Sequence, residues 1–455
     1  MKKLSSSRLK STYNMIVIAL ISILIVELSS CKWFSSTKIP IDGSPSHGVK
    51  EVSWNAVFKT GSLSAERNNA IIAIEDSVKK YYIDHFPSIY PEFHVFVCPC
   101  DTLLYNININ FIDGSGTAVT PPPPPKPGPN GSGDYVDVLF LANNIPISDS
   151  EDSFPVAIGP KIGLNRSLAN PTGVLAVIDT GIDTTVFMNS IGPLIWKESS
   201  GEPTMFNFLP GQIVQDLRDD HNGRHGTVVT AFALQAVKTA NNYPQIMVLK
   251  ALDERKRGTT FSVSCAMSYA IQKNASIINA SLGYYGDPDP VLEHYIQLCA
   301  LHQPNAIPVF AAAGNVDGTH DNTKLCLTPS INNRLGVTTR LFFPACFSRE
   351  FNNLFAVTSL NQQIDQPCYY QNYSNAFVTL GVLNMHNCCA FEVNFLKKHY
   401  EGTSFATPIA AGSMIDCMIR NSFNATNTNT DWNTNIIKHG ASGVTLNGNY
   451  ILENN

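Results

Sequence analysis

The chain has 455 residues, 44% of them hydrophobic, which is enough for one large domain and a smaller one. Its 31 basic and 36 acidic residues give a formal net charge of −5, so no electrostatic case exists for binding nucleic acid. The apolar content also excludes a disordered chain.

Residues 1–30 have the pattern of a signal peptide. A basic start, MKKLSSSRLK, precedes an uncharged apolar run at 15–26 that is too short to span a membrane as a helix. The following LSSC, which ends at Cys31, resembles the lipoprotein box of bacteria, where the signal is cut before a cysteine that is then acylated. An ordinary signal peptide with a cysteine near its cleavage point is the alternative. We therefore expect export, either as a cell-envelope lipoprotein held in a membrane through Cys31 or as a secreted protein.

Residues 31–119 are predicted to form a small α+β module. Apolar residues recur at helical spacing over 62–85, and two short strands follow, FHVFVC and LLYNININ. The Pro/Gly-rich segment 120–134 is typical of a semi-rigid linker and marks the predicted boundary with a second domain at 135–455.

From residue 173 onward, short apolar strands alternate with helical segments. This alternation over 173–420 predicts an α/β domain with a parallel sheet and helices on both faces. The tail, 421–455, is rich in Asn, and its Asn447–Gly448 pair predicts a terminal β-hairpin. The expected elements are the strands VLAVID, QIMVLKAL, SIINASLG and AIPVFAAAGN and the helices that begin near 225, 261 and 290.

Four polar residues are predicted to meet at one edge of this sheet. Asp179 and Asn315 lie at the carboxyl ends of two strands, and His225 and Ser404 each begin a helix. A serine hydroxyl needs a base to become a nucleophile, and a histidine oriented by a buried carboxylate supplies one. An amide side chain can donate a hydrogen bond to the oxyanion that then forms.

Residues 173–420 resemble the catalytic domain of subtilisin-like serine proteases. The matching blocks, in the order of that family, are VLAVIDTGID, HGT, SLG, AAAGN and GTSFATPIAAG. The resemblance implies a subtilisin-like fold and a serine endopeptidase with Asp179, His225, Ser404 and Asn315 as its catalytic residues. It also implies an extended peptide or protein substrate that pairs with two stretches of main chain. The substrate-binding residues implied are Arg257, Gly258, Ser281, Leu282, Gly283 and Gly314.

The resemblance implies an enzyme that needs no cofactor. Calcium binding is common in the family, but no ligands can be assigned here, and we expect a monomer. HGTVVTA departs from the usual HGTHVAG at Val228 and Ala231, which predicts altered helix packing. The N-terminal module could be a propeptide that assists folding, or a permanent spacer or docking domain. A catalytically silent lipoprotein that binds peptides, and a processing protease with a single partner substrate, are the alternative functions.

Ten cysteines follow Cys31. Cys265, Cys299 and Cys417 lie in apolar helical segments and are predicted to be buried thiols. At least one disulfide is predicted within 326–389, and no metal site is predicted at the CPC sequence of 98–100. The predicted disulfide would join two members of the set Cys326, Cys346, Cys368, Cys388 and Cys389.

Two further residue patterns concern specificity. Counting back from SLG, the resemblance implies that Lys256, Arg257 and Gly258 lie on the second substrate-pairing strand, with Arg255 and Arg257 alternating along it. These basic residues either favour acidic substrate residues two to four places before the cut or simply form a solvated turn. The resemblance implies a deep and mostly apolar pocket for the residue immediately before the cut. Val316 adds no charge there, so we expect large apolar side chains at that substrate position.

Overall fold

The computed structural model describes residues 52–113, 117, 138–148, 172–187, 191–198, 206–212, 215–239, 242–315, 341–361, 368, 371–383, 390–393, 398–438, 441, 444–445, 447 and 449–452. The predicted signal peptide, Cys31 and the linker 120–134 lie outside these residues. Among the helices that are described, none is long and apolar enough to cross a membrane.

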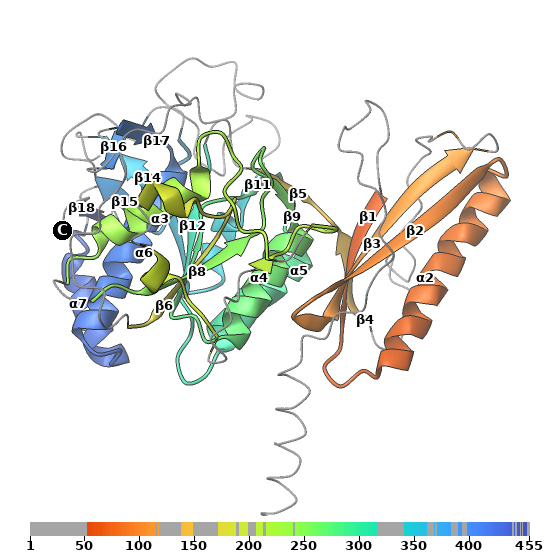
Figure 1. Cartoon of the computed structure of the whole chain (residues 1–455), viewed down its shortest axis with the longest axis horizontal. Helices are drawn as coiled ribbons and strands as arrows, with labels where there is room; N and C mark the ends of the chain where they lie inside the picture. The colour runs from red at the N-terminus through yellow and green to blue at the C-terminus, as the bar shows by residue number, and fades with distance from the viewer. Residues whose placement is uncertain are drawn as a thin grey trace, which may run out of the picture.

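The N-terminal module consists of a four-stranded antiparallel sheet and one long helix, coloured orange in Figure 1. The helix matches the span predicted at 62–85. The sheet has the order β2-β3-β1-β4. Its elements are β1 (Val52–Phe58), α2 (Ser64–His85), β2 (Ile89–Cys98), β3 (Asp101–Asp113) and β4 (Val138–Asn143).

The end of this module differs from the predicted one. Strand β4 pairs with β1 inside the N-terminal sheet, with Ala142 opposite Asn55. Because β4 follows the proline-rich segment in the chain, that segment connects two strands of the same module. The module therefore extends past residue 119 to the end of β4, and a short strand, β5 (Pro146–Ser148), comes directly after it.

The side chains of β3 point alternately to the two faces of the N-terminal sheet, so each face has its own kind of residue. Ile107 and Ile109 point to one side and are buried beneath α2. Asn106 points to the other side, where its Nδ2 donates to Asn55 Oδ1 at 3.1 Å. Asn55 in turn donates to Thr260 Oγ1 at 2.9 Å, at the start of a helix of the larger domain. The Asn-rich face of this sheet thus forms a hydrogen-bonded junction with the rest of the chain.

The larger domain is built on an eight-stranded sheet of order β18-β15-β14-β12-β10-β6-β8-β7, in which every pair is parallel. This confirms the predicted α/β class. The strands are β6 (Val174–Asp179), β7 (Phe206–Asn207), β8 (Gln245–Lys250), β10 (Ile277–Ala280), β12 (Val309–Ala312), β14 (Leu354–Leu360), β15 (Leu380–Leu383) and β18 (Tyr450–Leu452).

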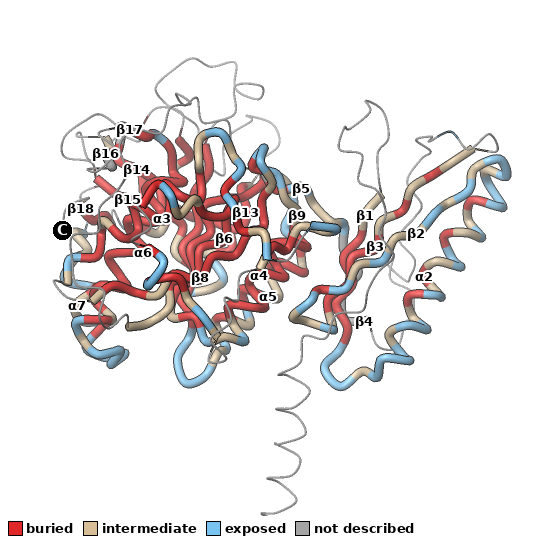
Figure 2. Tube along the Cα trace, viewed as in Figure 1, coloured by how far each residue is buried: buried red, intermediate tan, exposed pale blue. Residues whose placement is uncertain are grey.

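Helices cover both faces of this sheet. The side chains of β6 alternate: Leu175 and Val177 join the core with α3 and α6, whereas Ala176 and Ile178 join the core with α4 and α5. Figure 2 shows the resulting buried layer through the centre of the domain. The helices are α3 (His225–Ala236), α4 (Thr260–Gln272), α5 (Pro290–Leu301), α6 (Thr403–Arg420) and α7 (Ala425–Asn435).

Short elements complete the domain. Three two-stranded pairings lie outside the main sheet, namely β5 with β9, β11 with β13, and β16 with β17. Their remaining members are β9 (Arg257–Thr259), β11 (Tyr284–Gly286), β13 (Leu341–Phe343), β16 (Ala390–Val393) and β17 (Lys398–Glu401), and the 3-10 helices are Thr184–Phe187, Gly192–Leu194 and Ala345–Arg349.

The described part of the Asn-rich tail contains α7 and β18, but the predicted terminal hairpin is wrong. Strand β18 pairs in parallel with β15 at the edge of the main sheet, and Val444 and Thr445 lie in a turn. Although α7 is almost wholly polar, the Asn424 side chain caps it by accepting from the Asn427 N–H at 3.0 Å, and Trp432 is buried. One buried aromatic residue per helix was too weak a periodicity to detect in the sequence.

Candidate active site

The carboxylate and the imidazole of the candidate site come from adjacent parts of the fold. Asp179 is the last residue of β6, and His225 is the first residue of α3. Their side chains are buried, with His225 Nδ1 2.8 Å from Asp179 Oδ1. A carboxylate can only accept a hydrogen bond, so Nδ1 carries the proton and the Nε2 lone pair is left to act as a base. The Thr180 N–H also donates to Asp179 Oδ1, at 2.7 Å, which fixes the orientation of the carboxylate.

Two glycines allow this close approach. Gly181 has a φ of +112°, and a Cβ there would lie 2.3 Å from the Leu217 carbonyl oxygen. A Cβ on Gly226 would lie 3.1 Å from Asp179 Oδ1 and 2.4 Å from the Gly181 carbonyl oxygen. The close contact between Asp179 and His225 therefore needs both Gly181 and Gly226.

Behind this pair lies a second buried carboxylate, Asp219, which the sequence analysis missed. It accepts from Thr180 Oγ1 at 2.8 Å, from the Thr227 N–H at 2.9 Å and from Thr227 Oγ1 at 2.7 Å. Burial raises the pKa of Asp219 above its ordinary value, the three hydrogen bonds oppose that shift, and the charge of Asp179 adds to it. Asp219 thus joins the residue after Asp179 to the first turn of α3. The only signal in the sequence was an acidic pair, Asp219–Asp220, shortly before His225.

Asp183, the second acid of the VLAVIDTGID stretch, makes another link between this stretch and HGT. The Arg224 guanidinium lies 3.1 Å from Asp183 Oδ2. The Asp183 N–H donates to Thr227 Oγ1 at 2.9 Å. The turn after β6 and the start of α3 are therefore held together by one ion pair and a set of buried hydrogen bonds.

Ser404 is the second residue of α6 and is buried. Its two neighbours in the chain contact the other candidate residues. The ring of Phe405 lies 5.4 Å from that of His225 between centroids, and the Thr403 N–H donates to Asn315 Oδ1 at 2.9 Å. In the chain, Ser404 therefore lies between a residue that contacts the imidazole and a residue that contacts the amide.

Asn315 follows β12 and is also buried. Since its Oδ1 faces the Thr403 N–H, its Nδ2 must point the other way, and within the described residues this nitrogen has no hydrogen-bond partner. A buried amide N–H₂ without a protein partner is a donor available to a ligand. The strand order β12-β10-β6 explains why Asn315 and Asp179 meet at one edge of the sheet.

The basic stretch predicted to flank the substrate has a different arrangement from the expected one. Only Arg257 of the three basic residues lies on β9, because Arg255 and Lys256 belong to the preceding turn and Lys256 is buried with a φ of 58°. Arg257 is paired with Asp253, with Nη2 3.0 Å from Oδ2. Its charge is thus largely balanced within the turn.

A segment of the chain itself occupies the edge on which Arg257 and Gly258 were predicted to bind substrate. β5 pairs antiparallel with β9, with Ile147 opposite Gly258 and Ser148 opposite Arg257. β5 also contacts β11, which follows the predicted SLG stretch. This edge can therefore take an extended peptide by main-chain pairing.

The other predicted substrate residues lie nearby, with side chains that serve the core. Ser281 accepts from Asn279 Nδ2 at 3.0 Å, Leu282 is buried, and a Cβ on Gly283 would overlap the Phe342 ring. The Gly314 N–H donates to Thr403 Oγ1 at 3.0 Å, and its carbonyl accepts from the Asn372 N–H at 2.9 Å. Both main-chain groups of Gly314 are thus engaged, which leaves only its Cα atom to line a cleft. Val316 lies outside the described residues.

The prediction of a buried thiol at Cys265 is wrong, because Cys265 forms a disulfide with Cys98. Cys299 and Cys417 are buried free thiols, as predicted. Cys368 is disulfide-bonded too, but Cys326, Cys388 and Cys389 lie outside the described residues, so the bridge predicted there stays a prediction.

The described residues offer one cluster of metal-binding side chains, formed by Cys98, Cys100 and Cys265. Two of these sulfurs are joined in the disulfide, so the cluster does not fit a metal ion in this state. No calcium ligands can be named among the described residues.

The parallel sheet and the residues at its carboxyl edge define a class of protein, the α/β serine peptidases. Comparison with protein families matches residues 172–439 to the Subtilase family. This match covers more than half of the sequence, and the chain belongs to the subtilase family. A comparison with curated proteins finds no match.

Solved structures show the same fold. The epidermin leader peptide processing serine protease (EpiP) from Staphylococcus aureus is similar in two structures. A mutant form is 15% identical with a TM-score of 0.58, over 89% of this chain and 98% of that one. The other structure is 13% identical with a TM-score of 0.52, over 88% and 97%. At these identities the likeness supports the fold alone, but it extends over the N-terminal module as well as the larger domain.

Proposed function

We propose that the protein is a serine endopeptidase in which Ser404 attacks the carbonyl carbon of a peptide bond. His225 Nε2 takes the hydroxyl proton and later gives it to the leaving amine, while Asp179 orients the ring and stabilises its charged form. The single observation that supports this most strongly is the buried hydrogen bond of 2.8 Å between Asp179 Oδ1 and His225 Nδ1.

Asn315 Nδ2 and the Ser404 N–H would hold the oxyanion of the tetrahedral intermediate. The support for Asn315 is the Thr403 N–H, which orients the amide so that its nitrogen is the group left free to donate. A hydrogen-bond donor that is already oriented before the reaction stabilises the transition state more, because no reorganisation of the donor is needed.

The substrate would lie extended along β9, with Ser281, Leu282 and Gly283 on the opposite side of the cleft. The antiparallel pairing of β5 with Arg257–Thr259 supports this direction and mode of binding. Because β5 directly follows the N-terminal module, we further propose that the module is a propeptide that blocks this edge until the chain is cut. Comparing the N-terminus of the mature wild type with that of Ser404→Ala tests this role, since a permanent docking domain would stay attached in both.

We also propose that the protein is exported and that, until the N-terminal module is removed, a lipid on Cys31 holds it in a membrane. The support is the sequence of residues 15–31. A secreted form without an anchor is the alternative.

A fluorophosphonate probe tests the catalytic assignment. It should label the processed wild type, and Ser404→Ala should lose the label, whereas Ser413→Ala on the same helix should keep it. A catalytically silent peptide-binding protein would not react in any variant.

The range of substrates is a separate question. The name of the EpiP structure describes a protease that processes a leader peptide, and this chain could likewise act on a single partner substrate. Digestion of a peptide library distinguishes the two cases, because a general endopeptidase would cut many members and a dedicated processing protease almost none.

A further inference from the structure

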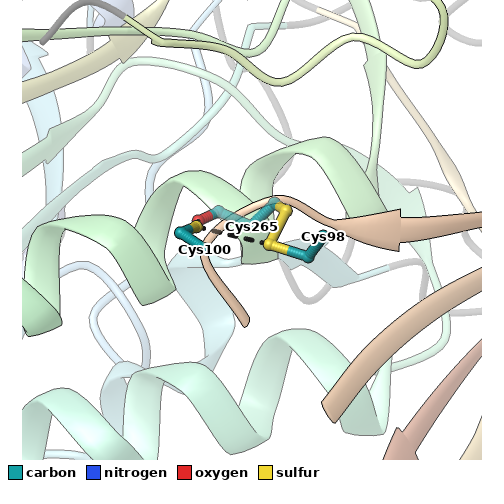
Figure 3. Close-up of side chains that lie close together, drawn as sticks. All are labelled: Cys98, Cys100 and Cys265. Atoms are coloured by element: carbon teal, nitrogen blue, oxygen red, sulfur yellow. Dashed lines mark hydrogen bonds between the residues drawn. A yellow bond between two sulfur atoms is a disulfide. The ribbon is translucent and has the colours of Figure 1, made fainter. Parts of the chain in front are cut away.

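Three sulfur atoms meet where the N-terminal module joins the larger domain. Cys98 is the last residue of β2, and Cys100 lies in the turn that leads to β3. Cys98 is joined to Cys265 of α4, which is 167 residues away in the chain. Figure 3 shows the Cys100 thiol beside this disulfide, with its Sγ 3.4 Å from Cys98 Sγ. A nucleophilic sulfur therefore lies in contact with the bond that links the two parts of the chain.

The turn is held in this position by α4 and α5. Gln272 Nε2 donates to the Cys100 carbonyl at 2.6 Å. Asp101 Oδ2 accepts from Tyr295 Oη at 2.6 Å and from Ser268 Oγ at 3.0 Å. These bonds place the thiol against the disulfide before any reaction, which removes much of the entropic cost of bringing the two together.

The three cysteines differ in how far they are exposed to solvent. Cys98 and Cys265 are buried, with 1% and 0% of their surface exposed, so a reductant in solution cannot reach their sulfurs directly. Cys100 is partly buried as a residue, and its sulfur lies in the buried cluster with the other two sulfurs. Burial raises the pKa of the Cys299 thiol, which makes this thiol a poor nucleophile and a suitable control.

We propose that Cys98, Cys100 and Cys265 form a thiol–disulfide exchange site that opens the covalent link between the N-terminal module and the larger domain. The Cys100 thiolate attacks Cys98 Sγ, the Cys98–Cys100 bond forms, and the Cys98–Cys265 bond breaks. Cys265 leaves as a thiolate and takes up the proton that Cys100 lost. One disulfide is exchanged for another, so the step needs no oxidant or reductant.

The exchange changes what the disulfide holds together. In the structure it joins the module to α4, and after the exchange it would only close a local loop within the β2–β3 turn. The module would then be held by non-covalent contacts, such as that of Asn55 with Thr260. Once the module is held only by non-covalent contacts, a reducing thiol in the surroundings would reduce the Cys98–Cys100 bond and complete the release.

The test follows reduction of the native, full-length protein by dithiothreitol. Ser404→Ala serves as the parent so that no self-cleavage occurs, which makes the result independent of the proposed proteolysis. Samples are quenched with acid, alkylated and mapped by tandem mass spectrometry. The appearance of alkylated Cys265 is compared between the parent, Cys100→Ser and Cys299→Ala.

We expect Cys265 to appear at least about tenfold faster in the parent than in Cys100→Ser, because only the parent has the internal nucleophile. Cys299→Ala should behave like the parent. Early samples of the parent should contain Cys98 linked to Cys100 together with a free Cys265, an observation that depends on no variant. Equal rates in the parent and Cys100→Ser would overturn the proposal. An early species that links Cys100 to Cys265 would also overturn it, because the module would then stay attached.

Discussion

The side chain of Asn315 is oriented by Thr403, whose backbone N–H donates to Asn315 Oδ1 at 2.9 Å. Thr403 immediately precedes Ser404, so the same turn that presents the candidate nucleophile also fixes the candidate oxyanion donor. Nδ2 has no partner among the described residues. The two groups are therefore coupled through one residue.

Asn315→Ala should lower kcat by about 10²–10³ with little change in KM, the loss typical of a missing oxyanion donor. Steady-state kinetics on a peptide ester or amide measures this. Asn315→Asp is the matched control: it keeps an acceptor for the Thr403 N–H but has no N–H to donate, so it should lose as much. Full activity in either variant would remove Asn315 from the oxyanion hole.

Asp219→Ala should destabilise the fold by about 2–3 kcal/mol, because it leaves three buried donors on Thr180 and Thr227 without their acceptor. It should also lower kcat, since Asp219 links the residue after Asp179 to the turn that begins with His225. Urea unfolding and kinetics measure the two effects. Asp219→Asn can still accept from Thr227 and should cost less than about 1 kcal/mol; equal losses in both variants would contradict this role.

The difference in free energy of unfolding between Asp219→Asn and the wild type should change with pH in one direction. Burial raises the pKa of Asp219 above its ordinary value of 3.8, so the folded protein keeps this proton to higher pH than the unfolded chain does. Its contribution to stability is therefore complete below 3.8 and is lost as the pH rises through the raised pKa. The free energy of unfolding of Asp219→Asn, relative to wild type, should increase across that interval and then level off. A relative decrease would mean that the hydrogen bonds outweigh burial.

The sequence predicted the parts of the fold that depend on local periodicity. The strand ending at Asp179 and the helix beginning at His225 have strong apolar patterns, and both lie where they were expected. Long-range pairing left no such pattern. The return of β4 to the N-terminal sheet, the bond from Cys98 to Cys265 and the docking of β5 on β9 each join residues far apart in the chain. Asp219 was missed for a related reason, because an isolated acid shows its role only through its partners.

Cys31→Ser should release the protein from membranes if the predicted lipoprotein box is used. The comparison is best made in Ser404→Ala, because removal of a propeptide would carry the anchor away with it. Cell fractionation followed by immunoblotting measures the distribution. Cys100→Ser is the control for loss of a cysteine and should stay with the membrane fraction. A Cys31→Ser protein that still sediments with membranes would place the anchor elsewhere.

Substrate preference near β9 should be governed by Asp253. Its Oδ2 pairs with Arg257, so the wild type should show little preference for acidic residues two to four places before the cut. Asp253→Asn keeps the Oδ1 atom that accepts from the N–H groups of Arg255 and Arg257, so the turn should persist while the Arg257 charge is freed. A single exposed ion pair contributes about 0.2–1 kcal/mol, so a preference of a few-fold for acidic residues should appear in this variant at low salt and weaken as salt is added.

Digestion of a peptide library by the processed enzyme measures this preference. Glu254→Gln, which removes an exposed acid outside the strand, is the control and should behave like wild type. An unchanged preference in Asp253→Asn would mean that Arg257 does not face the substrate.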